Sequence, residues 1–120
     1  MKMPISEIID RYTITKLKSE RTDENVIEEL RIYQHELKAY DSNLDTYITR
    51  MYNINGKIWD TESDIRKGIE LPLEDIGRLA LKVRDLNCER NAIKAEIEDQ
   101  FSEGFKEIKI NYKKVDYGQN

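Results

Sequence analysis

The most constraining feature of this chain is a run of apolar and tyrosine residues that recur alternately every four and three positions. The run keeps one phase throughout. Its members are Val26, Leu30, Tyr33, Leu37, Tyr40, Leu44, Tyr47, Met51, Ile54 and Ile58. This spacing places an apolar seam along one side of a helix, and a second helix must cover that seam. The sequence therefore predicts one long helix over residues 24–67 that crosses residues 41–43 without interruption.

Amphipathic segments stand on either side of this predicted helix. A helix over Ile5–Arg21 begins directly after Pro4, and a longer helix begins around Pro72; proline suits the first turn of a helix. Both connections are short, so both neighbours should run antiparallel to the central helix. The predicted fold is all-α, a long antiparallel helical hairpin with a short N-terminal helix and a coiled-coil-like seam. Residues 1–104 form this domain, and residues 105–120 form a C-terminal arm or tail.

The N-terminal helix carries apolar residues on two opposite faces, with Ile9 on one face and Ile14 and Leu17 on the other. A helix that is apolar on two sides is usually covered on both sides. The second cover is either the C-terminal helix or a second subunit. The tyrosines of the seam are bulky and suit a bundle wider than a two-stranded coil. We expect a homodimer that completes a four-helix-like bundle.

Composition excludes several classes of protein. Charged residues make up 37% of the chain, the net charge is −4, and no long basic stretch occurs, so nucleic acid is not an expected partner. No segment has the length and hydropathy of a signal peptide or of a membrane span, so we expect no membrane association. Cys88 is the only cysteine, which fits a reducing cytoplasm.

Polar residues interrupt the apolar pattern where the central and C-terminal helices are expected to pair. Arg90 occupies a seam position otherwise held by Leu and Ile, and antiparallel pairing brings Asn87 opposite Asn55, close to Trp59. Two interpretations stay open. The cluster is either an anion-binding site anchored by Arg90 or a buried polar network that fixes helix register. In both cases Arg90 should find a carboxylate or backbone carbonyls, because an unpaired buried guanidinium is too costly.

The remaining reactive side chains form no catalytic or metal-binding group. His35 is the only histidine, and a hydrogen bond to Asp10 is the simplest role for it. Cys88 lacks a nearby histidine that would activate it as a nucleophile. We therefore predict no catalytic residues, no metal and no cofactor.

With these motifs placed, the chain resembles a family of short bacterial and phage helical proteins of unknown function, some of them encoded near glycosyltransferase genes. The similarity rests on residues 7–21, on Tyr52–Arg66 with its Asn55-x-x-Ile58-Trp59-Asp60-x-Glu62 core, and on Leu79–Ile97. The resemblance implies no activity. It does imply that seven residues belong to one shared site or core, and we take them as candidate ligand-binding residues: Asn55, Trp59, Glu62, Arg66, Asn87, Arg90 and Lys94.

The leading functional interpretation is a non-catalytic, cytoplasmic helical interaction or scaffold protein with a protein partner. The composition, rich in Ile, Asn, Lys and Tyr, is compatible with a marine bacterium or phage. One alternative is an all-α enzyme or anionic-ligand-binding bundle that acts through Arg90, Lys94 and Asn55, as helical-bundle chorismate mutases do with interior Arg and Lys. Another is a Mg²⁺-dependent nucleotide pyrophosphatase that uses Asp60, Asp64 and Glu96, since Asp60 and Asp64 share a helix face.

Overall fold

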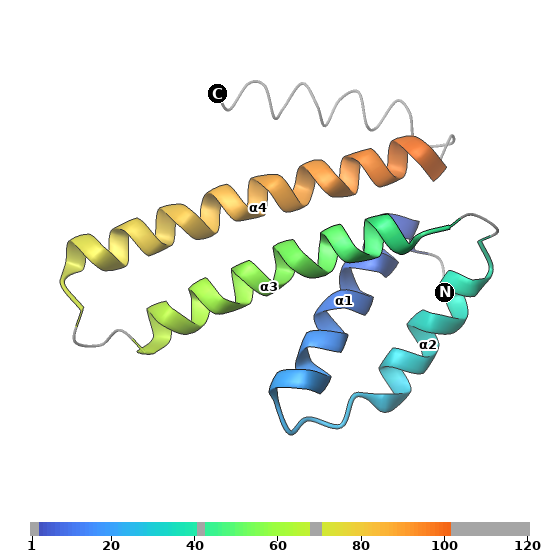
Figure 1. Ribbon diagram of the computed structural model, residues 1–120, viewed down its shortest axis with the longest axis horizontal. Coiled ribbons are helices and arrows are strands. Elements are labelled where there is room, and N and C mark those ends of the chain that lie inside the picture. The colour runs from blue at the N-terminus through green and yellow to red at the C-terminus, as the bar shows by residue number, and fades with distance from the viewer. Residues whose placement is uncertain (1–2, 41–42, 68–70, 102–120) are drawn as a thin grey trace.

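The computed structural model describes residues 3–40, 43–67 and 71–101, which form four α-helices (Figure 1). These are α1 (Ile5–Arg21), α2 (Ile27–Lys38), α3 (Asp45–Lys67) and α4 (Leu73–Phe101). The described residues contain no strand, so the predicted all-α class is confirmed. The predicted bounds of the N-terminal helix are also confirmed. The arm predicted for residues 105–120 lies outside the described residues.

The long helix predicted over residues 24–67 is wrong, because the structure divides this segment into α2 and α3. At the end of α2, the N–H groups of Ala39 and Tyr40 donate to carbonyls three residues earlier, a pattern common at helix ends. Before α3, the Asn43 side chain accepts a hydrogen bond from the Asp45 N–H at 2.9 Å. This bond satisfies a backbone donor that a continuing helix would have paired with a carbonyl.

The apolar repeat keeps its phase across the break because both sides face the same core. Leu37 at the end of α2 is 8% exposed and Leu44 just before α3 is 6% exposed. The rings of Tyr40 and Tyr47 both pack edge-on against Phe101 of α4. The repeat therefore indicates which residues are buried, and it does not require that the helix be continuous.

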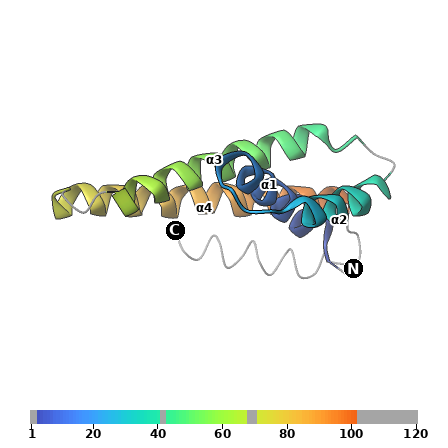
Figure 2. The same ribbon diagram turned by 90° about the horizontal axis from the view of Figure 1, so that it is seen from below.

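The four helices form two hairpins, α1–α2 and α3–α4, and α1 packs against the other three helices. α3 and α4 lie side by side, and α1 packs on the half of this pair that contains the start of α3, while α2 packs on α1 (Figures 1 and 2). The other half projects beyond them. We call this projecting part, residues 63–67 and 71–85, the distal hairpin. The sequence predicts that the first and last helices pack antiparallel along one central helix. In the structure that central helix is two helices, and the α1–α2 hairpin crosses the α3–α4 hairpin.

The core lies at this crossing and contains apolar residues from all four helices. Its buried members are Ile5, Ile8, Ile9, Tyr33, Leu37, Leu44, Met51, Ile54, Leu86 and Ile97. The second apolar face of α1 is also covered within the chain, since Leu17 is buried and packs beside Gly56 of α3. This face of α1 therefore does not need a second subunit.

Candidate functional site

A carboxylate–guanidinium pair joins α1 to α4 inside the crossing. Arg90 donates from Nε to Asp10 Oδ1 at 3.0 Å and from Nη2 to Asp10 Oδ2 at 2.5 Å. The side chain of Asp10 is 1% exposed and that of Arg90 is 26% exposed. The guanidinium fork matches both carboxylate oxygens. Arg90 thus has the carboxylate partner that its position in the apolar seam requires.

Asn55 links α3 to the same carboxylate. Its Nδ2 donates to Asp10 Oδ1 at 2.8 Å and to Thr13 Oγ1 at 2.9 Å. The Thr13 hydroxyl in turn donates to the backbone carbonyl of Asp10 at 2.8 Å. Asn55 is only 5% exposed, and a buried amide is costly unless its hydrogen bonds are made. These contacts therefore fix the orientation of the Asn55 side chain.

Lys94 and Glu7 extend this network between α4 and α1. Lys94 Nζ lies 2.7 Å from Glu7 Oε2 and 3.6 Å from Asp10 Oδ2. The hydrogen bond from Lys94 lowers the pKa of Glu7 in spite of its partial desolvation. Burial alone would raise the pKa of Asp10, but the hydrogen bonds from Arg90 and Asn55 outweigh burial and lower it. Both carboxylates are therefore ionised at neutral pH and balance the two basic side chains.

A cavity of about 490 Å³ opens beside this network, between α1, α3 and α4. Its lining consists of Ile14 and Leu17 from α1, Asn55, Ile58, Trp59, Glu62 and Arg66 from α3, and Asn87 and Arg90 from α4. Arg90 lines the cavity while it stays paired with Asp10. The Nη1 atom of Arg90 donates to Asn87 Oδ1 at 3.3 Å. Cavities of this volume are usual for small-molecule sites.

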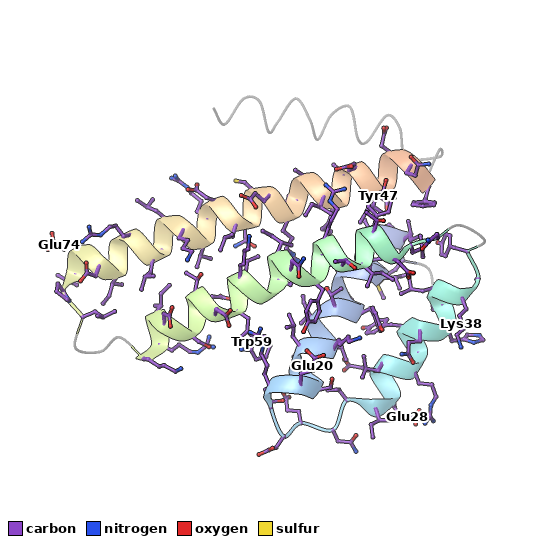
Figure 3. All side chains as sticks on the ribbon, in the orientation of Figure 1. Glu20, Glu28, Lys38, Tyr47, Trp59 and Glu74 are labelled. Atoms are coloured by element: carbon purple, nitrogen blue, oxygen red, sulfur yellow. The ribbon has the colours of Figure 1, made fainter. Side chains whose placement is uncertain are left out.

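All of the predicted ligand-binding residues except Lys94 line this cavity. Lys94 binds Glu7 instead. The grouping follows from helical spacing, because residues four and seven positions apart share one face of a helix. Trp59, labelled in Figure 3, projects from α3 on the side where α1 packs. The positions of these residues agree with the sequence-based grouping, and their binding role stays a prediction.

Sequence reasoning missed the contribution of α1 to this site, above all Asp10 and Thr13. Asp10 follows Ile9 within the apolar part of α1. A carboxylate at such a position needs a cationic partner, and this signal could have identified it. The expected contact between Asp10 and His35 is not formed, because Asp10 pairs with Arg90 while His35 is exposed on α2.

Two of the three carboxylates considered for a magnesium site, Asp60 and Glu96, are paired with arginines. Asp60 Oδ1 accepts a hydrogen bond from Arg21 Nη1 at 2.6 Å. The two carboxylate oxygens of Glu96 accept from Arg50 at 2.9 and 2.8 Å. Within residues 3–40, 43–67 and 71–101, no three His, Cys, Asp or Glu side chains are grouped so that they could hold a metal ion.

Comparison with known proteins finds no matching family model, no matching curated protein and no matching solved structure. The family resemblance therefore stays a prediction, and the functional proposals below rest on the geometry of this chain alone. None of the helices in the described part of the chain combines the length and apolar character needed to cross a membrane.

Proposed function

We propose that this chain is a non-catalytic helical interaction protein that acts as a homodimer. The observation that carries the proposal is the distal hairpin, a pair of helices over which no other helix of the described residues lies (Figure 2). Leu73 and Leu81 of α4 are 86% and 51% exposed. Ile76, Leu79 and Val83, which belong to the apolar seam of α4, are only partly buried. An amphipathic helix gains most of its stability from burying its apolar face, so this half of the molecule favours a further layer.

A second copy is the proposed occupant. Two distal hairpins stacked on each other give four helices, an arrangement that covers the apolar faces of both pairs. Twofold symmetric dimers are also the commonest soluble oligomers. The charges suit self-association, since Glu74 and Asp75 begin α4 while Lys67 ends α3. Acidic and basic groups of two copies can therefore face each other across the interface.

The ion pairs at the crossing support a non-catalytic role. Arg90 and Lys94, which a chorismate-mutase-like site would direct at an anionic substrate, are bound to Asp10 and Glu7. Of the carboxylates that a pyrophosphatase would direct at Mg²⁺, Asp60 and Glu96 are paired with arginines. Charges that are already compensated within the chain favour a structural role for these groups.

Light scattering at micromolar concentration tests the proposal. The wild type should show twice the chain mass of 14.3 kDa. Leu73→Ser combined with Leu81→Ser should give a monomer with unchanged helix content, because both side chains are already exposed within one chain. The matched control is Ile27→Ser with Ile32→Ser on α2, where the side chains are 61% and 47% exposed. This control should stay dimeric, and a monomeric wild type would contradict the proposal.

A further inference from the structure

The cavity between α1, α3 and α4 has two polar ends separated by apolar walls. Along α3, Asn55, Trp59, Glu62 and Arg66 follow one another at helical spacing, so they span about 16 Å of one helix face. Asn55 is buried and Arg66 is exposed, which makes these the inner and outer ends. The apolar walls between the two ends are formed by Ile14, Leu17, Ile58 and Trp59.

The inner end offers one acceptor and one donor. Asn55 uses Nδ2 for its bonds to Asp10 and Thr13, which leaves Oδ1, an acceptor, as its other polar atom. Asn87 uses Oδ1 to accept from Arg90, which leaves Nδ2, a donor. Both amides are oriented by these bonds before any ligand enters, and such preorganisation lowers the entropic cost of binding.

The outer end repeats this combination with charged side chains. Glu62 supplies acceptors and Arg66 supplies donors, and Arg66 Nη2 also donates to Ser63 Oγ at 3.3 Å. A hydroxyl group both donates and accepts hydrogen bonds. A ligand with hydroxyl groups at both of its ends would therefore match both ends of the cavity.

Charge balance disfavours an anion. The positive charge of Arg90 is compensated by the buried carboxylate of Asp10, and Arg66 shares the outer end with Glu62. A phosphate or carboxylate placed at the inner end would lie close to Asp10 without a cation of its own, which is costly in a buried setting. The anion-binding interpretation of Arg90 is therefore replaced by one in which the ligand is uncharged.

Trp59 supplies a flat apolar surface between the two polar ends. It is partly exposed and lines the cavity. The negative face of an aromatic ring attracts weakly polarised C–H groups, and one side of a sugar ring presents a patch of such groups between its hydroxyls. We infer that the cavity is a binding site for a neutral, polyhydroxylated ligand of the sugar class, with one ring against Trp59 and hydroxyl groups bonded at both ends. This inference does not depend on the proposed dimer, because the cavity lies within one chain.

The chain provides its own reporter for a test. Trp59 is the only tryptophan, so intrinsic fluorescence reports on the cavity. The full chain is titrated with five disaccharides, which are longer than a single ring and can approach both ends: maltose, cellobiose, lactose, trehalose and sucrose. It is titrated separately with sodium phosphate and sodium benzoate. We expect at least one sugar to change the emission in a saturable way and to raise the melting temperature, and neither anion to do so.

Two cavity variants and two matched controls complete the experiment. Asn87→Ala and Glu62→Gln should each weaken binding of that sugar at least about tenfold, or 1.4 kcal/mol, with unchanged helix content. Asn53→Ala and Glu89→Gln make the same changes at exposed positions outside the cavity and should leave the affinity unchanged.

Three results would overturn the inference. The first is saturation by phosphate or benzoate without saturation by any sugar. The second is a sugar affinity that neither cavity variant alters. The third is the absence of saturation by all five sugars up to about 100 mM, a concentration that corresponds to very weak binding.

Discussion

Asp10 and Arg90 are 80 residues apart in the sequence, and their side chains form a bidentate ion pair that holds α1 against α4. Asn55 donates to the same carboxylate, so α1, α3 and α4 meet at one buried group. Exposed ion pairs usually contribute little to stability. This pair differs because its carboxylate is 1% exposed and would be left without compensation if the guanidinium were removed.

Arg90→Met should be strongly destabilising, even though an apolar residue suits a seam position. The substitution leaves the Asp10 carboxylate buried without its bidentate partner, and breaking a buried pair in this way costs about 3–5 kcal/mol. Asp10→Asn together with Arg90→Met removes both charges and keeps an oxygen that can accept from Asn55. We therefore expect the double variant to be more stable than Arg90→Met alone. Urea unfolding of both single variants and the double variant measures the interaction free energy between Asp10 and Arg90. Losses of stability that simply add would argue against this interaction.

Stability should fall as the pH is lowered from about 5 to about 3. In the folded chain the pKa values of Asp10 and Glu7 lie below their ordinary values, whereas in the unfolded chain they return to about 4. The unfolded chain therefore binds more protons in this window. The stabilisation is complete above the unfolded pKa values and is lost as the pH falls through the folded ones.

Thermal unfolding of the wild type and of Asp10→Asn across this pH window measures the effect. The variant lacks one of the two carboxylates, so its melting temperature should depend less on pH. Parallel curves for the two proteins would show that Asp10 does not contribute to the acid sensitivity.

Gly77→Ala should stabilise the chain by about 0.5–1 kcal/mol, the usual difference between Gly and Ala inside a helix. No described glycine has a positive φ, and no atom lies within 4 Å of a Cβ built on Gly77. A Cβ on Gly56 would lie 3.7 Å from Arg21 Nη2 and 4.0 Å from Leu17 Cδ2, which is ordinary contact. Gly56→Ala should therefore also be tolerated. A lower urea midpoint for Gly77→Ala would mean that this position contacts something outside the described chain.

Local patterns in the sequence were sufficient to predict the first helix and the residues around the cavity. Pro4 and the apolar spacing after it define the start of α1. The positions of Asn55, Trp59, Glu62 and Arg66 on one face of α3 follow from helical periodicity, and this holds whichever helix covers that face.

The division into α2 and α3 and the crossing of the two hairpins could not be predicted in the same way. The regular spacing of buried residues is compatible with one straight helix and also with two helices packed around a common core. Leu37 and Leu44 are buried in either case. The position of α1 depends on the contact between Asp10 and Arg90. The sequence offers several arginines as partners for this carboxylate, and no local signal selects among them.

Asn43→Ala tests the break between α2 and α3, because the two arrangements predict opposite signs for the same substitution. In the structure, Asn43 Oδ1 accepts a hydrogen bond from the Asp45 N–H, and loss of such a side-chain bond at the start of a helix costs about 1 kcal/mol. If residues 24–67 formed one helix, the change would replace a poor helix former with the best one and would stabilise by roughly 0.5 kcal/mol. Asn53→Ala, at an exposed position within α3, provides the control and should be stabilising. The urea midpoint should therefore be lower than the wild type for Asn43→Ala and higher for Asn53→Ala. A higher midpoint for Asn43→Ala would instead support one continuous helix over residues 24–67.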